Sequence, residues 1–142
     1  MQVLKFGGTS VGDASAAKRV GNIVLDAVEQ DSTIVVASAI KKATDQLREI
    51  GHWAEKGDES YKEKLAQLKQ RHFEMIDELL QAEFRKELSA EIEALFCELS
   101  GICSGVALIR ELSFHTLDLI MSFGELCSTK ILATKFTSIG VS

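Results

Sequence analysis

The chain has 142 residues, which suits one compact domain, and its 46% hydrophobic content can supply a core. Its 16 basic and 21 acidic residues give a net charge of −5 without a basic tail, so nucleic acid and anionic membranes are not expected as partners. The start lacks the pattern of a signal peptide, and no run approaches ~18 consecutive apolar residues, so we expect a cytoplasmic protein without a membrane span.

The first part of the chain has an α/β pattern. We expect a strand near residues 2–6, a helix near 13–30 and a second strand near 33–37. The apolar residues of this helix recur at helical spacing and form one stripe, which consists of Ala16, Val20, Ile23, Val24 and Ala27. Two strands joined by a helix predict a parallel pair with a right-handed crossover.

The first strand runs into the hexapeptide Lys5-Phe6-Gly7-Gly8-Thr9-Ser10. Its glycines allow a turn whose amides can bind an anion, and a helix starting just after it would add its unpaired N–H groups. Lys5 would then neutralise charge on a transferring phosphoryl group. The alternative is a structural connector with a Thr or Ser helix cap. The spacing matches neither the Walker A sequence nor the dinucleotide fingerprint.

A second polar loop, Ser38-Ala39-Ile40-Lys41-Lys42-Ala43-Thr44-Asp45, follows the second strand. Ligands of open α/β sheets gather beyond the carboxyl ends of the strands, which makes this loop a candidate binding segment. Its hydroxyl and amide groups are possible donors to a ligand. The alternative is a strand-to-helix turn in which Thr44 is the helix cap.

From about residue 44 to 136 the pattern is helical and charged, and the chain contains no proline. The longest amphipathic run contains Leu65, Leu68, His72, Met75, Ile76, Leu79 and Leu80, and it is followed by Ile92, Leu95, Phe96 and Leu99. Helix breaks are expected at Gly57-Asp58 and Ser100-Gly101, and helix starts at Ser60 with Glu63 and at Ser89 with Glu91. A heptad coiled coil over residues 59–99 is the alternative.

Glu125 lies in the otherwise apolar stretch around Ser122-Phe123-Gly124-Glu125-Leu126-Cys127-Ser128. A carboxylate among apolar neighbours is costly unless it is paired, so Glu125 is a candidate for binding a cation. The alternative is a glutamate in the first turn of a helix, where the helix dipole favours it. Residues 136–142 predict a helix end and the first residues of another strand, so the sheet looks incomplete.

The cysteines and histidines show no ligand spacing. Cys97, Cys103 and Cys127 form no C-x-x-C pair and lie in apolar helical surroundings, so we expect buried free thiols. The histidines at positions 52, 72 and 115 are scattered, and we expect them to be surface or half-buried residues.

Three segments resemble the aspartate kinases of the amino acid kinase family. These are Lys5-Phe6-Gly7-Gly8-Thr9-Ser10-Val11-Gly12, the loop from Ser38 to Asp45, and the segment from Ser122 to Ser128, in the family's order. The resemblance implies an α/β fold, an incomplete amino-acid-kinase (carbamate-kinase-like) sandwich with parallel amino-terminal strands and a predominantly helical segment at about 44–136. Residues 1–142 would be the amino-terminal portion of one catalytic domain. In having a lysine at position 41, this loop resembles that of the aspartate kinases that are fused to homoserine dehydrogenase.

The resemblance also implies a reaction and a site. The complete enzyme would transfer the γ-phosphoryl group of ATP, with Mg²⁺ as counter-ion, to the β-carboxylate of L-aspartate, in the route to lysine, threonine and methionine. The implied ATP phosphate site contains Lys5, Gly7, Gly8, Thr9 and Ser10, with Lys5 catalytic. The implied aspartate site contains Ser38, Ala39, Thr44 and Glu125, with Glu125 on the α-ammonium group.

The family's kinase domain continues to a glycine-rich nucleotide segment that this sequence lacks, so we expect the 142 residues alone to be inactive. We expect a homo-oligomer that binds L-aspartate and ATP but neither nucleic acid nor membrane, and no dedicated metal ligands. The alternative is a non-catalytic helical interaction module that retains the kinase motif.

Overall fold

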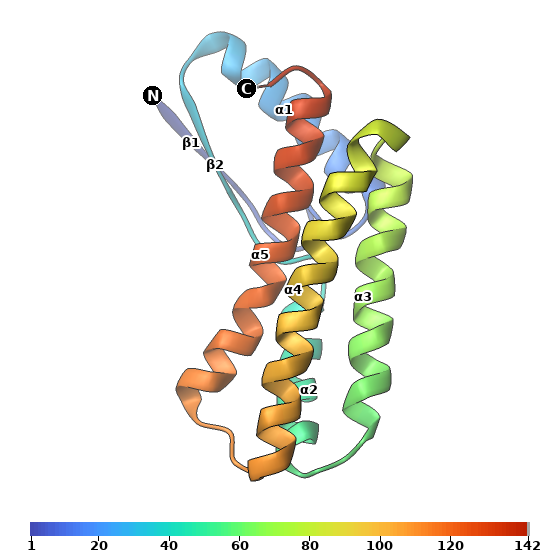
Figure 1. Cartoon of the computed structure of the whole chain (residues 1–142). Coiled ribbons are helices and arrows are strands. Elements are labelled where there is room, and N and C mark those ends of the chain that lie inside the picture. The colour runs from blue at the N-terminus through green and yellow to red at the C-terminus, as the bar shows by residue number, and fades with distance from the viewer. Residues whose placement is uncertain (142) are drawn as a thin grey trace.

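The computed structural model describes residues 1–141 and begins with a βαβ unit (Figure 1). Strand β1 (Gln2–Phe6) and strand β2 (Thr33–Ala37) are parallel, with Gln2 opposite Thr33 and Phe6 opposite Ala37, and helix α1 (Ala14–Gln30) joins them. The predicted strands and helix are therefore confirmed. Because the register brings both strand ends together, the loops that follow them begin side by side.

Helix α1 begins at a polar cap and buries an apolar face. The side chain of Asp13, the N-cap, accepts a hydrogen bond of 2.7 Å from the amide of Ala16. The buried face contains Val20 and Val24, as the apolar stripe predicts, but Ile23 is 50% exposed.

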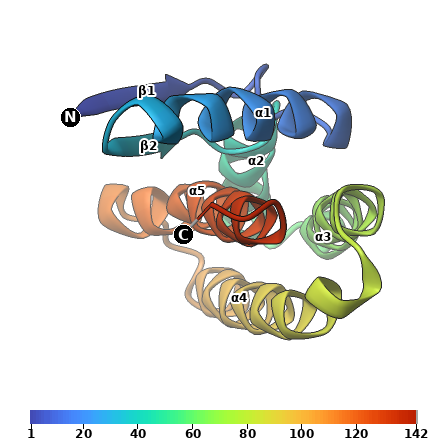
Figure 2. The ribbon, with the colours of Figure 1, turned by 90° about the horizontal axis from the view of Figure 1, so that it is seen from above.

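The remaining chain forms four long helices: α2 (Ala43–Glu55), α3 (Ser60–Leu79), α4 (Ala82–Ile109) and α5 (Phe114–Ser138). Seen from above, the strands and α1 form one layer, and α3, α4 and α5 lie on one side of it (Figure 2). The break at Gly57 is confirmed: its φ is +68°, and the guanidinium of Arg110 covers it where a Cβ would stand. The helix start near Ser60 is confirmed as well.

The second expected helix break is wrong. Ser100 and Gly101 lie inside α4, as does Ser89, which therefore does not start a helix. A single helical glycine costs only about 1 kcal/mol relative to alanine, which a long packed helix can tolerate. The coiled-coil alternative is also wrong, because the chain turns back at Leu80 and Gln81 and places α4 beside α3 (Figure 1).

One core runs through the helices and under the sheet. Ile50, Ile76, Ile92 and Ile131 have no exposed surface, and the half-buried Leu4, Phe6, Val35 and Ala37 pack against this core from one face of the sheet. The other sheet face remains open: Val3 is 60% exposed, Ile34 49% and Val36 45%. The expected further strand does not appear at residues 139–141, and Ser142 lies outside the described residues.

Helix α4 differs from the expectation that no segment could span a membrane. By length and composition alone it could do so, and 28% of its most apolar window is buried in the structure. It packs against α2, α3 and α5. In this structure, the long apolar helix α4 therefore has one face in the core of the helical bundle.

One cysteine and one histidine differ in burial from the expectation of buried thiols and of surface or half-buried histidines. Cys103 and Cys127 are buried, and burial raises the pKa of their thiols to about 11 and about 12, but Cys97 is exposed. His72 is fully buried rather than half-buried, and its Nδ1 lies 2.8 Å from the carbonyl oxygen of Leu68. Burial lowers the pKa of His72, so the neutral ring is favoured in the fold.

Candidate functional site

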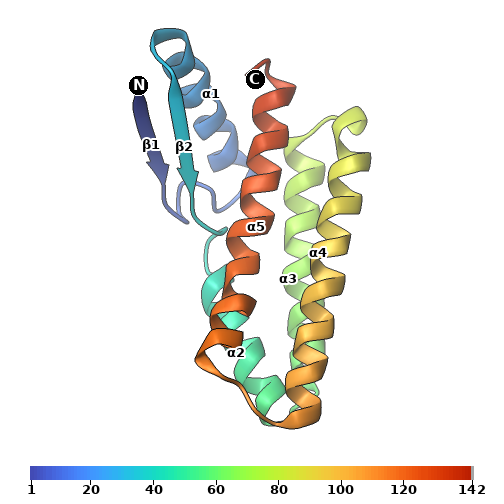
Figure 3. The same cartoon turned by 60° about the vertical axis from the view of Figure 1, so that its left-hand side comes forward.

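Three segments that are distant in sequence meet at the carboxyl ends of the two strands. Strands β1 and β2 point at the same region, and the middle of α5 passes beside it (Figure 3). The amide of Ser38 donates a 3.0 Å hydrogen bond to the carbonyl oxygen of Phe6 and thus joins the two strand ends. The switch from strand to loop therefore occurs at one place in both strands.

The turn after β1 is shaped by close backbone approach. The amide of Ser10 donates to the carbonyl oxygen of Gly7 at 2.9 Å, which closes the turn. A Cβ on Gly8 would lie 3.2 Å from the carbonyl oxygen of Ala39, whereas a Cβ on Gly7 would meet no described atom within 4 Å. Gly8 thus brings the two loops together, and Gly7 faces open space where a ligand can approach.

Helix α1 does not begin directly after this turn. Residues 9–13 separate the two, and Asp13 rather than Thr9 or Ser10 caps the helix, so the connector alternative with a Thr or Ser cap is wrong. The expected help of the helix N-terminus is also reduced, because the Asp13 carboxylate already accepts from the amide of Ala16. Any anion near Gly7 therefore depends on the turn itself and on Lys5.

The loop between β2 and α2 presents its backbone to the same region. Ser38 and Thr44 are half-buried and Ala39 is buried. Lys42 is the N-cap of α2, without a side-chain cap bond in the described chain, so the alternative in which Thr44 caps the helix is wrong. The hydroxyl of Thr44 is therefore not committed to the cap.

Helix α5 closes the region through two small residues. A Cβ on Gly124 would lie 2.8 Å from the Cβ of Ala39 and 3.3 Å from the Cδ1 of Leu47, so the helix can approach the loop only with glycine there. The buried Ser128 donates from Oγ to the carbonyl oxygen of Ser38 at 2.7 Å. Neither residue was a predicted site residue, although a glycine inside a helix with serine four positions later was a readable signal.

Glu125 lies between these two contacts, in the middle of α5, so the first-turn alternative for it is wrong. It is half-buried, and its carboxylate belongs to none of the ion pairs found among residues 1–141. Lys5 is exposed and also belongs to none of these ion pairs, and it lies opposite Val36 on the open face of the sheet. Within residues 1–141, Lys41 and Lys42 of the neighbouring loop form no ion pair either, so Glu125 and these three lysines remain available for a ligand.

Thr9 and Ser10 also border a separate hollow. This cavity of about 260 Å³ lies between the turn and α1, and Phe6, Arg19 and Ile23 complete its wall with them. Gly8, Ser38, Ala39 and Glu125 belong instead to the meeting point of the loops with α5. The structure therefore brings Gly8, Ser38 and Ala39 together, with Glu125 next to Gly124 in α5, and places Thr9 and Ser10 at the edge of this meeting point.

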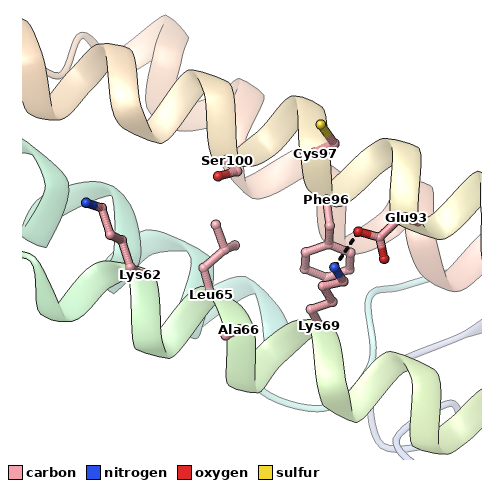
Figure 4. A pocket seen from close by; sticks show the side chains of 8 residues that line it. All are labelled: Lys62, Leu65, Ala66, Lys69, Glu93, Phe96, Cys97 and Ser100. Atoms are coloured by element: carbon pink, nitrogen blue, oxygen red, sulfur yellow. Dashed lines mark hydrogen bonds and ion pairs between the residues drawn. The ribbon is translucent and has the colours of Figure 1, made fainter.

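A surface groove lies elsewhere, between α3 and α4 (Figure 4). It has a volume of about 310 Å³, Lys69 and Glu93 form an ion pair across it, and Phe96 lies at its base. It contains none of the predicted site residues. Within residues 1–141, no group of three His, Cys, Asp or Glu side chains is arranged to hold a metal ion.

Comparison with known proteins identifies relatives of the whole segment. The model of the amino acid kinase family matches residues 1–142. Aspartokinase 1, chloroplastic, from Arabidopsis thaliana is 33% identical over 98% of this chain and 24% of its own length. Bifunctional aspartokinase/homoserine dehydrogenase 1, chloroplastic, from the same plant is 29% identical over 98% of this chain and 15% of its own length.

Solved structures of an aspartokinase also match this chain. Aspartokinase III of E. coli in complex with lysine and aspartate matches with a TM-score of 0.85 and 30% identity, over 100% of this chain and 30% of that chain. The same enzyme in complex with aspartate and ADP gives a TM-score of 0.82 at 30% identity, over 98% and 29%. This chain thus spans less than a third of each of these relatives.

Proposed function

Because the chain belongs to the amino acid kinase family, we propose that residues 1–142 are the amino-terminal portion of the catalytic domain of an aspartate kinase. The similarity to aspartokinases over nearly the whole chain supports this proposal. The complete domain would transfer the γ-phosphoryl group of ATP to the β-carboxylate of L-aspartate, yielding ADP and 4-phospho-L-aspartate. This product would enter lysine, threonine and methionine biosynthesis.

One observation carries the proposal: the close meeting of Gly8, Ala39 and Gly124, in which each residue comes from a different family-like segment. Three resembling motifs that were scattered in space would be weak evidence for a shared site. Packed together beyond the strand ends, they occupy the position where open α/β sheets bind ligands. The unpaired Lys5 and Glu125 add charges of both signs, which suit a phosphate group and an amino group respectively.

Each residue has a role in this proposal. Lys5 offsets negative charge on the transferring group, and the amides at Gly7, Gly8 and Thr9 bind phosphate oxygens, with Ser10 beside them. The amino acid lies on the second loop, where Ser38, Ala39 and Thr44 supply hydroxyl and amide donors. Glu125 binds the α-ammonium group of L-aspartate, and phosphoryl transfer then depends on positioning and charge neutralisation rather than on covalent catalysis.

ATP fits the anion-binding chemistry of the turn, whereas Mg²⁺ finds no built site of its own. No suitable cluster of acidic or imidazole ligands occurs in the part of the chain that the structure describes. Mg²⁺ would therefore arrive on the phosphates of ATP, which commonly supply much of its coordination.

Ligand binding to the 142-residue chain tests the proposal. L-aspartate is titrated into labelled protein and backbone amide shifts are followed by NMR, and we expect saturable shifts at Ser38 and Ala39. Glu125→Gln should weaken aspartate binding about tenfold, because it removes a charge-assisted hydrogen bond. The exposed Glu98 provides the control, and Glu98→Gln should leave the affinity unchanged.

Two outcomes would contradict this assignment. One is the absence of any shift at millimolar L-aspartate, and the other is an equal loss of affinity in both variants. A parallel titration with ADP should respond to Lys5→Met but not to Glu125→Gln. In a coupled assay with ATP and L-aspartate, we expect no turnover by the 142 residues alone.

A second candidate function, a non-catalytic interaction module, is favoured by the open sheet face. Val3, Ile34 and Val36 expose apolar surface beside two unpaired strand edges, which promotes pairing with another chain. Size-exclusion chromatography with light scattering tests this function. Self-association that is lost in Val36→Lys, in a chain that binds no L-aspartate, would favour the module over the enzyme.

A further inference from the structure

The loop that follows β2 contains an unfavourable backbone conformation. Lys42 has φ 66° and ψ 0°, in the left-handed region, and it is not a glycine. Side chains with a Cβ adopt this region only when their surroundings hold them there, and such residues cluster at ligand-binding loops. Something must therefore keep the chain in place between Ser38 and Ala43.

A guanidinium group from α3 holds this loop. Arg71 donates from Nη2 to the carbonyl oxygen of Lys41 at 2.9 Å and from Nη1 to Oε1 of Gln46 at 2.6 Å. The planar fork of arginine thus joins the loop to the first turns of α2 with one rigid group. A lysine could not make both bonds in the same geometry.

The turn that follows β1 also contacts Lys41, through Gly12. A Cβ on Gly12 would lie 3.0 Å from the Cβ of Lys41 and 3.1 Å from the carbonyl oxygen of Gly8. Gly12, Ile40 and Arg71 also line one hollow of about 170 Å³. The backbone of Lys41 is thus bonded by Arg71, while its exposed side chain begins close to Gly12 of the first loop.

The conformation held by Arg71 determines which amides remain for a ligand. The amide of Ala43 donates to the carbonyl oxygen of Ile40 at 2.9 Å, and the amide of Gln46 to that of Lys42 at 3.0 Å. The amides of Thr44 and Asp45, between them, belong to the first turn of α2, where backbone N–H groups lack partners within the helix. Such amides are donors for a carboxylate, and their direction follows the turn at Lys42.

We propose that Arg71 is a positioning residue for the substrate loop: by holding Lys41 and Gln46 it keeps the loop in the conformation that presents the Thr44 and Asp45 amides to the carboxylate of the amino acid. This inference rests on the proposed function. It assigns a task at the site to a residue of α3, a helix that lies outside the three family-like segments. Arg71 itself does not touch the substrate.

A purely structural arginine in the same chain provides the matched control. Arg110 donates from Nη1 to the carbonyl oxygen of Lys56 at 3.0 Å and from Nε to that of Ala107 at 3.1 Å. It thus also joins two elements through backbone carbonyls. The turns that it joins lie at the far end of α2 and α4 from the strand ends (Figure 1).

The experiment compares Arg71→Met, Arg71→Lys and Arg110→Met in the 142-residue chain. Three quantities are measured: the melting temperature, the amide hydrogen-exchange rates of Ala43 and Gln46, and the dissociation constant for L-aspartate from NMR titration. Arg71→Met should raise both exchange rates about tenfold and weaken aspartate binding about tenfold. Arg71→Lys, which keeps the charge and loses the fork, should show roughly a threefold change in each.

The control separates positioning from stability. Arg110→Met should lower the melting temperature about as much as Arg71→Met, yet leave the two exchange rates and the aspartate affinity within about twofold of the parent chain. Equal effects of Arg71→Met and Arg110→Met on aspartate affinity would overturn the inference, as would unchanged exchange at Ala43 and Gln46. If Arg71→Met does not fold, the inference is tested with Arg71→Lys, by the same exchange rates and the same dissociation constant.

The inference and the proposed function fail in different ways. A parent chain that does not bind L-aspartate overturns the proposed function and, with it, the substrate role of Arg71. A parent chain that binds L-aspartate with the same affinity as Arg71→Met leaves the proposed function standing and overturns only the inference.

Discussion

The βαβ unit and the helical segment hold the candidate site in different ways. In the βαβ unit, hydrogen bonds between neighbouring strands and a glycine turn form the site, and one sheet face stays open to solvent. In the helical segment, buried apolar residues pack four long helices into a closed core, from which single side chains reach back to the loops. The first region contains the glycine turn and the strand ends, and the second fixes the position of the neighbouring loop and contains Thr44 and Glu125.

Because of this difference, the same side-chain truncation should change stability by different amounts in the two regions. A side chain in the closed core has neighbours on all sides, so its loss leaves a cavity. A side chain on the open sheet face loses little when it is shortened, since water already covers much of it. Four measurements test this contrast.

The largest expected effect is that of truncating a core isoleucine. Ile92→Ala should lower the free energy of unfolding by about 3 kcal/mol, because Ile92 is fully buried between helices. Ile34→Ala, the same substitution on the open sheet face, should lower it by less than about 1 kcal/mol. Urea unfolding followed by circular dichroism gives both values, and equal losses would show that the sheet face is covered in solution.

The next effect concerns the close approach of α5 to the loop between β2 and α2. Gly124→Ala should destabilise the chain by about 2 kcal/mol, because its Cβ would lie 2.8 Å from the Cβ of Ala39. Gly101→Ala in α4 is the matched control, since a Cβ there meets no described atom within 4 Å. This control should stabilise the chain by about 0.5 to 1 kcal/mol, through helix propensity alone. Effects of the same sign would contradict the close approach.

Acid should weaken the helical segment through His72. Burial lowers its pKa, the hydrogen bond with the carbonyl oxygen of Leu68 raises it, and the charge of Arg71 lowers it again, with burial the largest effect. The unfolded chain, with an ordinary pKa of 6.5, takes up a proton that the folded chain resists, so stability is lost as the pH falls below about 6.5. Unfolding measured from pH 7 downward should show a slope of up to about 1.4 kcal/mol per pH unit.

Two variants test the source of this slope. His72→Gln should flatten it, even if the variant is less stable overall. His115→Gln, at an exposed position in α5, should leave it unchanged. A slope that survives in His72→Gln would assign the acid sensitivity to carboxylates elsewhere in the chain.

The smallest effect is expected from the hydroxyl that joins α5 to the loop. Ser128→Ala should cost about 1 kcal/mol, because the carbonyl oxygen of the half-buried Ser38 loses its donor. Thr129→Ala is the control: its hydroxyl is exposed and bonds only within α5, so the change should stay within about 0.5 kcal/mol. If the two losses are equal, Ser128 contributes no more than an ordinary helical hydroxyl.

The sequence predicted the βαβ unit closely and the helical segment only in outline. Alternating and continuous apolar patterns located both strands and α1, because each has a period that its own residues impose. The expected helix start at Ser89 and the expected break at Ser100-Gly101 were wrong, because cap-like residues also occur inside long helices, where packing decides the outcome. The exposure of Cys97 and the burial of His72 likewise depend on which helix lies opposite, and a periodic pattern contains no such information.

By itself, the sequence determined the elements at the amino terminus and the three family-like segments. Only the tertiary structure decided that Gly124 and Ser128 press on the loop at Ser38 and Ala39, and that Arg71 holds Lys41. These contacts join residues 30 to 90 positions apart. Local preferences act over one or two turns of chain, whereas a close contact between distant residues exists only once the core has fixed where each helix lies.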